Sequence, residues 1–246
     1  MDVRELAPGL WRWTAPHPAW KPENDKPGGW GRMVASISYE PGNDVRRASD
    51  ASLVLIDPLA PPDGSADADL FWRHLDEDVE RVGLPVAVLI ANEFHGRSAQ
   101  AVYDRYRAKP GASVWAHEDA AGKLTCPITD PFRAPRTLPS GVQPHVIANP
   151  TPAEVVYFIP EHSALVVADV LIGSGPGQVR LAPASWAEPD EASQRHYKDA
   201  FRATVRKLLE LPIEKLLASH SEPILTNARD AMREALDAPA WGEQEP

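Results

Sequence analysis

Short apolar runs, separated by Pro, Gly and Asp, alternate along the chain with longer segments whose apolar residues recur every three or four positions. The short runs are typical of β-strands, and residues 86–90 are apolar throughout, as in a strand covered on both faces. The longer segments are typical of amphipathic helices. The expected strands are residues 10–13, 33–39, 52–56, 86–90, 113–116, 145–148, 154–159, 164–168 and 215–218, and the expected helices are residues 70–82, 98–108, 192–210 and 227–236.

Strands and helices are interspersed through both halves of the chain, which favours an α/β (α+β) protein with two sheets packed face to face and helices outside. The length of 246 residues fits one large domain, with a packed core over about residues 3–236 and a tail, 238–246, that frays. A loop rich in Pro and Gly occupies residues 14–31. Loops of this length in compact domains are usually functional or disordered.

Composition excludes several classes of function. The formal net charge of -10 argues against nucleic-acid binding, which needs clustered Lys and Arg, and the single cysteine, Cys126, excludes an internal disulfide or a thiolate zinc cluster. No apolar run reaches about 18 residues and the first residues lack a signal-peptide profile, so we expect a soluble, cytoplasmic protein without a membrane partner. Phosphate-binding and dinucleotide motifs are missing, so no nucleotide cofactor is expected. A small molecule remains the expected partner.

The order of these elements is similar to that of the metallo-β-lactamase superfamily. The resemblance covers about residues 3–236 and is carried by residues 54–57 (Val-Leu-Ile-Asp), by the strand that ends at Asn92, and by residues 165–169 (Leu-Val-Val-Ala-Asp). It implies an αββα four-layer sandwich with the active site along one edge of the two sheets. It also implies that the loop at residues 14–31 forms a flap over that site.

The family's signature, Thr-His-x-His-x-Asp-His, directly follows a buried strand and aligns with residues 92–98 without a gap. In this alignment Glu93 takes the first His position and His95 keeps the second. Arg97 replaces the Asp, and Ser98 replaces the last His. The segment that should bind two metal ions has therefore mostly been exchanged.

Three further ligand positions of the family lie downstream. Pro150 stands where the family has a His, whereas the resemblance implies that Asp169 is the retained bridging Asp and His220 the retained final His. Two metal ions that share a hydroxide each need several neutral nitrogen or anionic oxygen ligands. A guanidinium at position 97 cannot ligate a metal, and its charge opposes a cation nearby. We therefore do not expect a normal dinuclear centre.

Two interpretations of the site remain open. In the first, a single divalent cation (Zn, Fe, Mn or Ni) is bound by two imidazoles and two carboxylates, those of Glu93, His95, Asp169 and His220. In the second, Arg97 supplies the missing positive charge and pairs with Asp169, because a buried carboxylate without a partner is costly, and the site contains no metal. At most one metal ion is expected.

Candidates for substrate binding lie in the flap and at the end of the motif. Trp20 and Trp30 can offer apolar area to a substrate, although tryptophans are also often simply packed. Ser98 can contact a substrate or act as the N-cap of the following helix.

The sequence predicts a hydrolase-like protein that acts on a small ester, lactone, amide or thioester, with Arg97 stabilising the oxyanion. The alternative is a non-catalytic member of the fold that binds a small molecule or a protein in the same groove. A third possibility is metal-free acid/base chemistry, with Arg97 orienting a substrate carboxylate. The candidate catalytic residues are His95, Arg97, Asp169 and His220.

Overall fold

The computed structural model describes residues 1–148 and 153–243. One sheet has seven strands in the order β1-β2-β3-β4-β5-β6-β7, a second has four in the order β13-β10-β9-β8, and β11 and β12 form a separate pair. The strands are β1 (Asp2–Ala7), β2 (Leu10–Pro16), β3 (Met33–Tyr39), β4 (Leu53–Ile56), β5 (Val86–Ile90), β6 (Ala112–His117), β7 (Asp130–Phe132), β8 (Gln143–Ile147), β9 (Glu154–Ile159), β10 (Ala164–Val167), β11 (Leu171–Gly175), β12 (Gln178–Leu181) and β13 (Lys215–Ala218).

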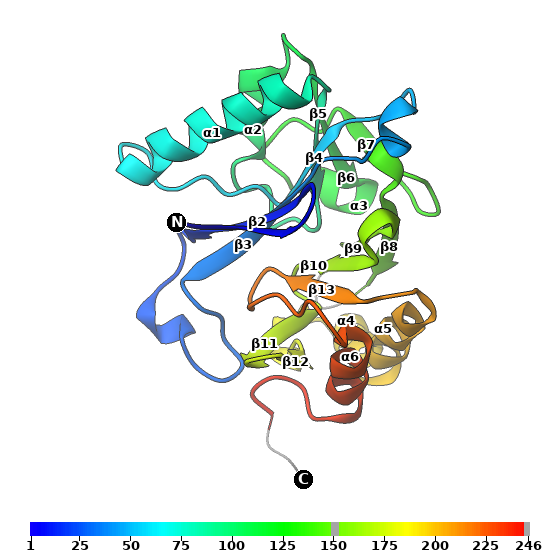
Figure 1. Cartoon of the computed structure of the whole chain (residues 1–246). Coiled ribbons are helices and arrows are strands. Elements are labelled where there is room, and N and C mark those ends of the chain that lie inside the picture. The colour runs from blue at the N-terminus through cyan, green and yellow to red at the C-terminus, as the bar shows by residue number, and fades with distance from the viewer. Residues whose placement is uncertain (149–152, 244–246) are drawn as a thin grey trace.

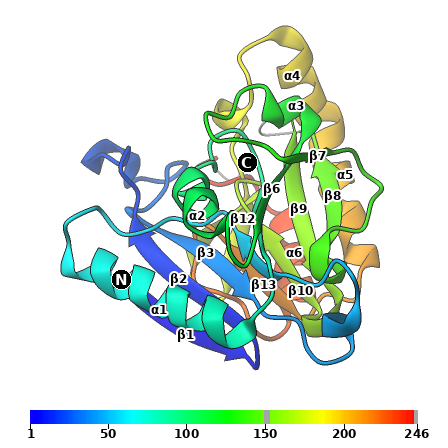
Figure 2. The same cartoon turned by 90° about the horizontal axis from the view of Figure 1, so that it is seen from above.

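The two larger sheets face each other across an apolar layer to which β3, β4 and β5 contribute from one side and β9, β10 and β13 from the other. A second cluster joins the outer face of the seven-stranded sheet to α1 and α2, and a third joins the four-stranded sheet to α5 and α6. Figure 1 shows these helix pairs at opposite ends of the molecule, and Figure 2 looks down onto α1 and α2. The expected αββα sandwich is confirmed. The helices are α1 (Ala66–Val82), α2 (Ala99–Tyr106), α3 (Glu118–Ala121), α4 (Glu191–His196), α5 (Arg202–Lys207) and α6 (Ala228–Asp237).

Helix α1 illustrates how the local sequence sets an element. Ser65 caps its N-terminus by accepting a hydrogen bond from the Ala68 N–H, and Gly83 ends it in the left-handed conformation that glycine adopts without strain. Phe71, Leu75 and Val79 are spaced by four residues and are therefore buried on one face. None of the helices in the described ranges combines the length and hydropathy needed to cross a lipid bilayer.

Strand direction brings the candidate residues together. β4 and β5 are parallel neighbours in one sheet, and β10 and β13 are parallel neighbours in the other. The loops that follow these four strands carry Asp57, residues 91–98, Asp169 and residues 219–220. Because parallel neighbours end at the same edge of a sheet, each sheet presents two of these loops to one side of the molecule.

Several expectations about elements were wrong. The helix expected over residues 192–210 is interrupted by a π-helical turn, Tyr197–Phe201, which separates α4 from α5. Strand β1 was missed because four of its six residues are exposed, so it lacks an apolar run. β11 and β12 were missed because the Gly-rich stretch at residues 173–177 forms the second half of β11 and the turn of the hairpin.

The tail expected to fray is instead bonded to the protein as far as it is described. The Trp241 N–H donates to the Leu181 carbonyl at 2.7 Å, and the indole Nε1 of Trp241 donates to the Gly29 carbonyl at 3.1 Å. A Cβ on Gly242 would lie 2.5 Å from the Gly28 nitrogen. The tail can therefore pack against residue 28 of the flap loop only because residue 242 has no side chain. Residues 244–246 lie outside the described ranges.

The flap is held by indole N–H groups. Because β2 extends to Pro16 and β3 begins at Met33, the flap loop comprises residues 17–32. Trp186 donates from Nε1 to the Gly28 carbonyl at 2.9 Å, and Trp241 donates to the neighbouring carbonyl of Gly29. Two tryptophans from the C-terminal half therefore fix adjacent peptide groups of an N-terminal loop.

Tyr157 connects the two sheets behind the site. Its side chain is fully buried on β9, and its hydroxyl donates to the Ile90 carbonyl of β5 at 2.7 Å. We expect Tyr157→Phe to lower the free energy of unfolding by about 1–2 kcal/mol, because a buried carbonyl loses its partner. Urea denaturation measures this, with Tyr103→Phe, a partly buried tyrosine of α2, as the control. A Tyr157→Phe variant as stable as the wild type would contradict the prediction.

The indole bonds to the flap can be tested separately from overall stability. We expect Trp241→Phe to increase amide hydrogen exchange across residues 17–32 by about tenfold, because one bond that restrains the loop is lost. Exchange in β5 should stay unchanged. Trp72→Phe on α1 is the matched control, since it exchanges a tryptophan far from the flap. Equal flap exchange in both variants would show that the Trp241 bond does not restrain the loop.

Candidate functional site

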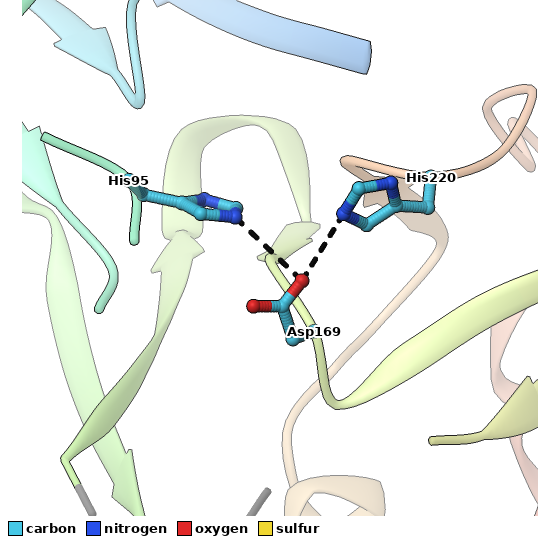
Figure 3. Close-up of side chains that lie close together, drawn as sticks. All are labelled: His95, Asp169 and His220. Carbon is cyan, nitrogen blue, oxygen red and sulfur yellow. Dashed lines mark hydrogen bonds and ion pairs between the residues drawn. The ribbon is translucent and has the colours of Figure 1, made fainter. Parts of the chain in front are cut away.

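The loops after β4, β5, β10 and β13 bring Asp57, His95, Asp169 and His220 into one cluster. The four side chains are 5%, 4%, 10% and 7% exposed, respectively. As Figure 3 shows, both imidazoles turn a ring nitrogen toward Asp169, with Oδ1 lying 3.6 Å from His95 Nε2 and 3.1 Å from His220 Nε2.

His95 is oriented from behind by Asp57. Its Nδ1 lies 2.7 Å from Asp57 Oδ2, while Asp57 Oδ1 accepts the Ala91 N–H at 2.8 Å. Burial and the charge of Arg97 lower the pKa of His95, but the carboxylates of Asp57 and Asp169 outweigh them and raise it to about 9. A carboxylate that fixes one ring nitrogen leaves the other, Nε2, directed into the cluster.

Asp169 is the shared acceptor of the cluster. Its Oδ2 accepts the Asn92 side-chain N–H at 2.7 Å, while Oδ1 lies between the two imidazoles. Burial opposes ionisation of Asp169, but the charge of His95 and the hydrogen bond from His220 hold its pKa well below the usual range. Asp169 is therefore a carboxylate that only accepts, so His220 Nε2 must carry a proton.

Glu154 supports Asp169 from the interior. It opens β9 with no exposed surface, and its Oε1 accepts the backbone N–H groups of Asp169 and Val170, both at 2.8 Å. Burial and the charge of Asp169 raise the pKa of Glu154 well above its ordinary value. Glu154 therefore fixes the backbone at positions 169 and 170 by accepting both N–H groups.

Arg97 lies beside His95, with its terminal nitrogens fully engaged. Nη1 donates to the carbonyls of Ala35 at 3.1 Å and Asp57 at 3.2 Å. Nη2 donates to Ser219 Oγ at 3.1 Å and lies 3.2 Å from His95 Nε2. Three of these contacts are donated N–H bonds, and the fourth, with His95 Nε2, is a hydrogen bond only when that nitrogen is unprotonated.

The expected pairing of Arg97 with Asp169 was wrong. No ion pair joins the two side chains in the described part of the chain, because the carboxylate of Asp169 is already bonded by Asn92 and His220. Arg97 and Asp169 interact through their charges, with Arg97 in contact with the same nitrogen of His95, Nε2, that faces Asp169.

A cavity of about 370 Å³ opens beside this cluster. Trp30, Phe94 and Trp186 form its apolar walls, and His95, Arg97, Asp169 and His220 its polar side. The rings of Trp30 and Trp186 contact that of His220 edge-on, at 5.6 and 6.1 Å between centroids, and Phe94 is 63% exposed at the rim. A larger open groove of about 830 Å³ runs along α4 and α5, away from the cluster.

The structure brings together some of the expected site residues and not others. His95, Asp169 and His220 converge, with one candidate ligand atom from each lying within 4.8 Å of the others. Glu93 does not join them, because its Oε2 pairs with Lys123 Nζ at 2.7 Å. The position of Pro150 lies outside the described residues.

The three residues that were expected to contact a substrate do not all lie in the cavity wall. Trp30 lines the cavity, whereas Trp20 is not among the lining residues and donates from Nε1 to the Trp30 carbonyl at 3.1 Å. Ser98 is the N-cap residue of α2, but its side chain makes no capping bond and accepts the Ala60 N–H at 2.9 Å instead. Trp20 and Ser98 therefore support the walls of the site rather than line it.

Several residues of the site were not predicted, among them Phe94 at the rim. Asn92 and Glu154 hold Asp169, Ser219 holds Arg97, and Trp186 forms a wall of the cavity. Glu154 had a signal in the sequence, since it is a charged residue at the start of an otherwise apolar strand. Trp186 had none, because its contact with the flap joins residues far apart in the chain.

The residues present do not fit the pair of metal ions that the family resemblance implies. The guanidinium of Arg97 stands at one ligand position, and Glu93 is bonded elsewhere. The spacing of His95 Nε2, Asp169 Oδ1 and His220 Nε2 suits one ion, since ligands about 2.0–2.1 Å from a tetrahedral ion lie about 3.3 Å apart. One of these ligands, His95 Nε2, is already in contact with Arg97.

No family model matches the chain. No curated protein sequence matches it either. Solved structures do match the chain. A beta-lactamase domain protein from Burkholderia ambifaria aligns with a TM-score of 0.65 and 14% identity over 95% of this chain and 71% of that one.

Two further structures give the same result. A metallo-beta-lactamase from Pontibacter korlensis aligns with a TM-score of 0.63 and 12% identity over 97% of this chain and 99% of that one. The flavodiiron protein from Giardia intestinalis aligns with a TM-score of 0.59 and 15% identity over 96% of this chain and 59% of that one. At sequence identities this low, the similarity shows only that the backbones share a fold. The chain therefore has the metallo-β-lactamase fold.

Proposed function

We propose that this protein hydrolyses a small molecule with a reactive carbonyl, such as an ester, lactone, amide or thioester, and that it does so without a pair of metal ions. The observation that carries the proposal is the Asp169–His220 pair beside the aromatic-walled cavity. A carboxylate bonded to an imidazole at the edge of a pocket is the arrangement expected of a general base.

The proton positions of this pair follow from its geometry. Because Asp169 can only accept, Nε2 of His220 donates to it and Nδ1 carries the lone pair. Nδ1 is buried and has no hydrogen-bond partner in the part of the chain that the structure describes. For the proposed reaction a water molecule must reach the buried Nδ1 of His220, which takes its proton as the water oxygen attacks the carbonyl. The tetrahedral intermediate then collapses, the bond to the leaving oxygen, nitrogen or sulfur breaks, and the imidazolium, stabilised by Asp169, returns the proton to that leaving group.

Arg97 contributes positive potential beside the reacting carbonyl. Its two terminal nitrogens contact four protein atoms, so the proposed mechanism assigns them no hydrogen bond to the developing oxyanion. A fixed charge in a largely buried site still favours the negative charge that forms on the carbonyl oxygen. Arg97 therefore acts here through its field.

The cavity limits the substrate to a small molecule with an apolar part. A volume of about 370 Å³ lies at the lower end of ligand pockets, and the indoles of Trp30 and Trp186 form flat apolar walls. The proposed pose places the apolar group against these indoles and the carbonyl toward His220.

A panel of nitrophenyl esters, simple lactones, amides and thioesters in metal-depleted buffer tests this proposal. We expect His220→Ala and Asp169→Asn each to lower kcat by about 10²–10⁴-fold on a substrate that turns over, because each removes part of the general base. Glu93→Gln is the matched control, because it exchanges a carboxylate for an amide in the loop that carries His95 but outside the cluster. It should keep the wild-type kcat. Circular dichroism checks that each variant is folded. Turnover that survives both His220→Ala and Asp169→Asn would contradict the proposal.

Non-catalytic binding of a small molecule is the second candidate, favoured by one observation. Asp57, His95, Arg97 and Ser219 are joined by a continuous series of polar contacts, as in a site that holds a shape rather than one that moves protons. Saturable binding of aromatic esters without turnover, lost on Trp30→Ala, would support this candidate over the first.

A further inference from the structure

Arg97 is a partly buried cation at the centre of a site that resembles a metal centre. Its backbone has φ of 34°, in the left-handed region that residues other than glycine rarely adopt. Such a conformation persists only where the surroundings hold it, and here the bonds to Ala35, Asp57 and Ser219 do so. The guanidinium is therefore a fixed part of the pocket and not a mobile surface group.

The contact between Arg97 and His95 decides whether the imidazole can ligate an ion. A metal needs a lone pair on Nε2. If His95 is neutral with its proton on Nδ1, toward Asp57, that lone pair accepts the N–H of Arg97 at 3.2 Å. If His95 is charged, Nε2 carries a proton instead. Nε2 has no free lone pair in either state.

Charge balance gives the same result. The carboxylates nearest the guanidinium, those of Asp57 and Asp169, act on it as opposite charges. A divalent ion bound beside Arg97 would add two positive charges to a buried site that already holds one. Like charges that lie close together in a poorly solvated site repel each other strongly. A bound ion and the guanidinium would therefore compete for the same negative carboxylates.

Without Arg97, the remaining ligands suit one ion. His95 Nε2, Asp169 Oδ1 and His220 Nε2 lie within 4.8 Å of one another, and Asp169 Oδ1 is 3.6 and 3.1 Å from the two nitrogens. These separations are close to those around a tetrahedral ion that keeps a fourth position for water. Asp57 already holds His95 from behind, as carboxylates hold metal-binding histidines.

We propose that Arg97 is the resident cation of this pocket: it excludes divalent metal ions from the wild-type protein, and its removal opens a site for a single ion at His95, Asp169 and His220. The inference goes beyond the proposed hydrolysis and does not depend on it. Its test measures bound metal, so a failure here and a failure of the ester assay are read separately.

The experiment dialyses the wild type, Arg97→Gln and Arg97→Lys against micromolar Zn²⁺ at neutral pH and measures bound zinc by elemental analysis. We expect almost none in the wild type or Arg97→Lys, which keeps the charge, and about one equivalent in Arg97→Gln. Co²⁺ in place of Zn²⁺ should give Arg97→Gln the visible absorption of a four-coordinate site. Adding His220→Ala to Arg97→Gln should abolish both signals.

Arg12→Gln is the matched control, since Arg12 is a buried arginine near the loop that carries His220 but is bonded to the Ser221 carbonyl. It should bind no zinc. One equivalent of tightly bound zinc in the wild type would overturn the proposal, as would a folded Arg97→Gln that binds no more than the wild type.

A measurement on the wild type covers the case in which Arg97→Gln does not fold. In protein labelled with ¹⁵N-histidine, one equivalent of Zn²⁺ should leave the His95 Nε2 resonance unchanged. A shift of that resonance on adding Zn²⁺ would mean that the ion reaches His95 despite Arg97, and would overturn the proposal.

Discussion

The guanidinium of Arg97 is the interaction on which the site depends, because it connects segments of both sheets at the edge where they meet. It bonds to the carbonyl of Ala35 on β3 and to that of Asp57 after β4, and it reaches Ser219 after β13 in the opposite sheet. Ser219 in turn donates to the Ala35 carbonyl at 3.1 Å. Arg97 therefore links the loop that carries His95 to the second sheet, in addition to the bond from Tyr157 to Ile90.

The fold could be predicted from the sequence wherever burial leaves a continuous apolar run. Strands β5 and β10 are buried at every position and stand out for that reason. The same property located the site, since residues that end such runs must lie at the sheet edge. It failed for β1, which is largely exposed, and for the helical region after residue 190, where a π-helical turn leaves no mark in the apolar spacing.

The composition of the site was harder to predict than its place. His95, Asp169 and His220 meet because each follows a buried strand, which is a local property of the sequence. Glu93 also follows such a strand, but Lys123, more distant in sequence, takes its carboxylate. The contacts of Trp186 with the flap and of Asn92 with Asp169 likewise join distant parts of the chain. Local pattern specifies where a side chain starts, and tertiary partners decide where its polar atoms point.

The covalent attachment of Arg97 has a consequence that a bound ion would not share. The population of a metal-loaded site obeys mass action and varies with the free ion concentration, whereas a cation built into the chain is present in every folded molecule. A guanidinium cannot accept a lone pair from a water molecule, so it increases the acidity of that water far less than a bound metal ion does. The pocket therefore has the same positive charge in every folded molecule, but that charge is a weaker electrophile than a metal ion.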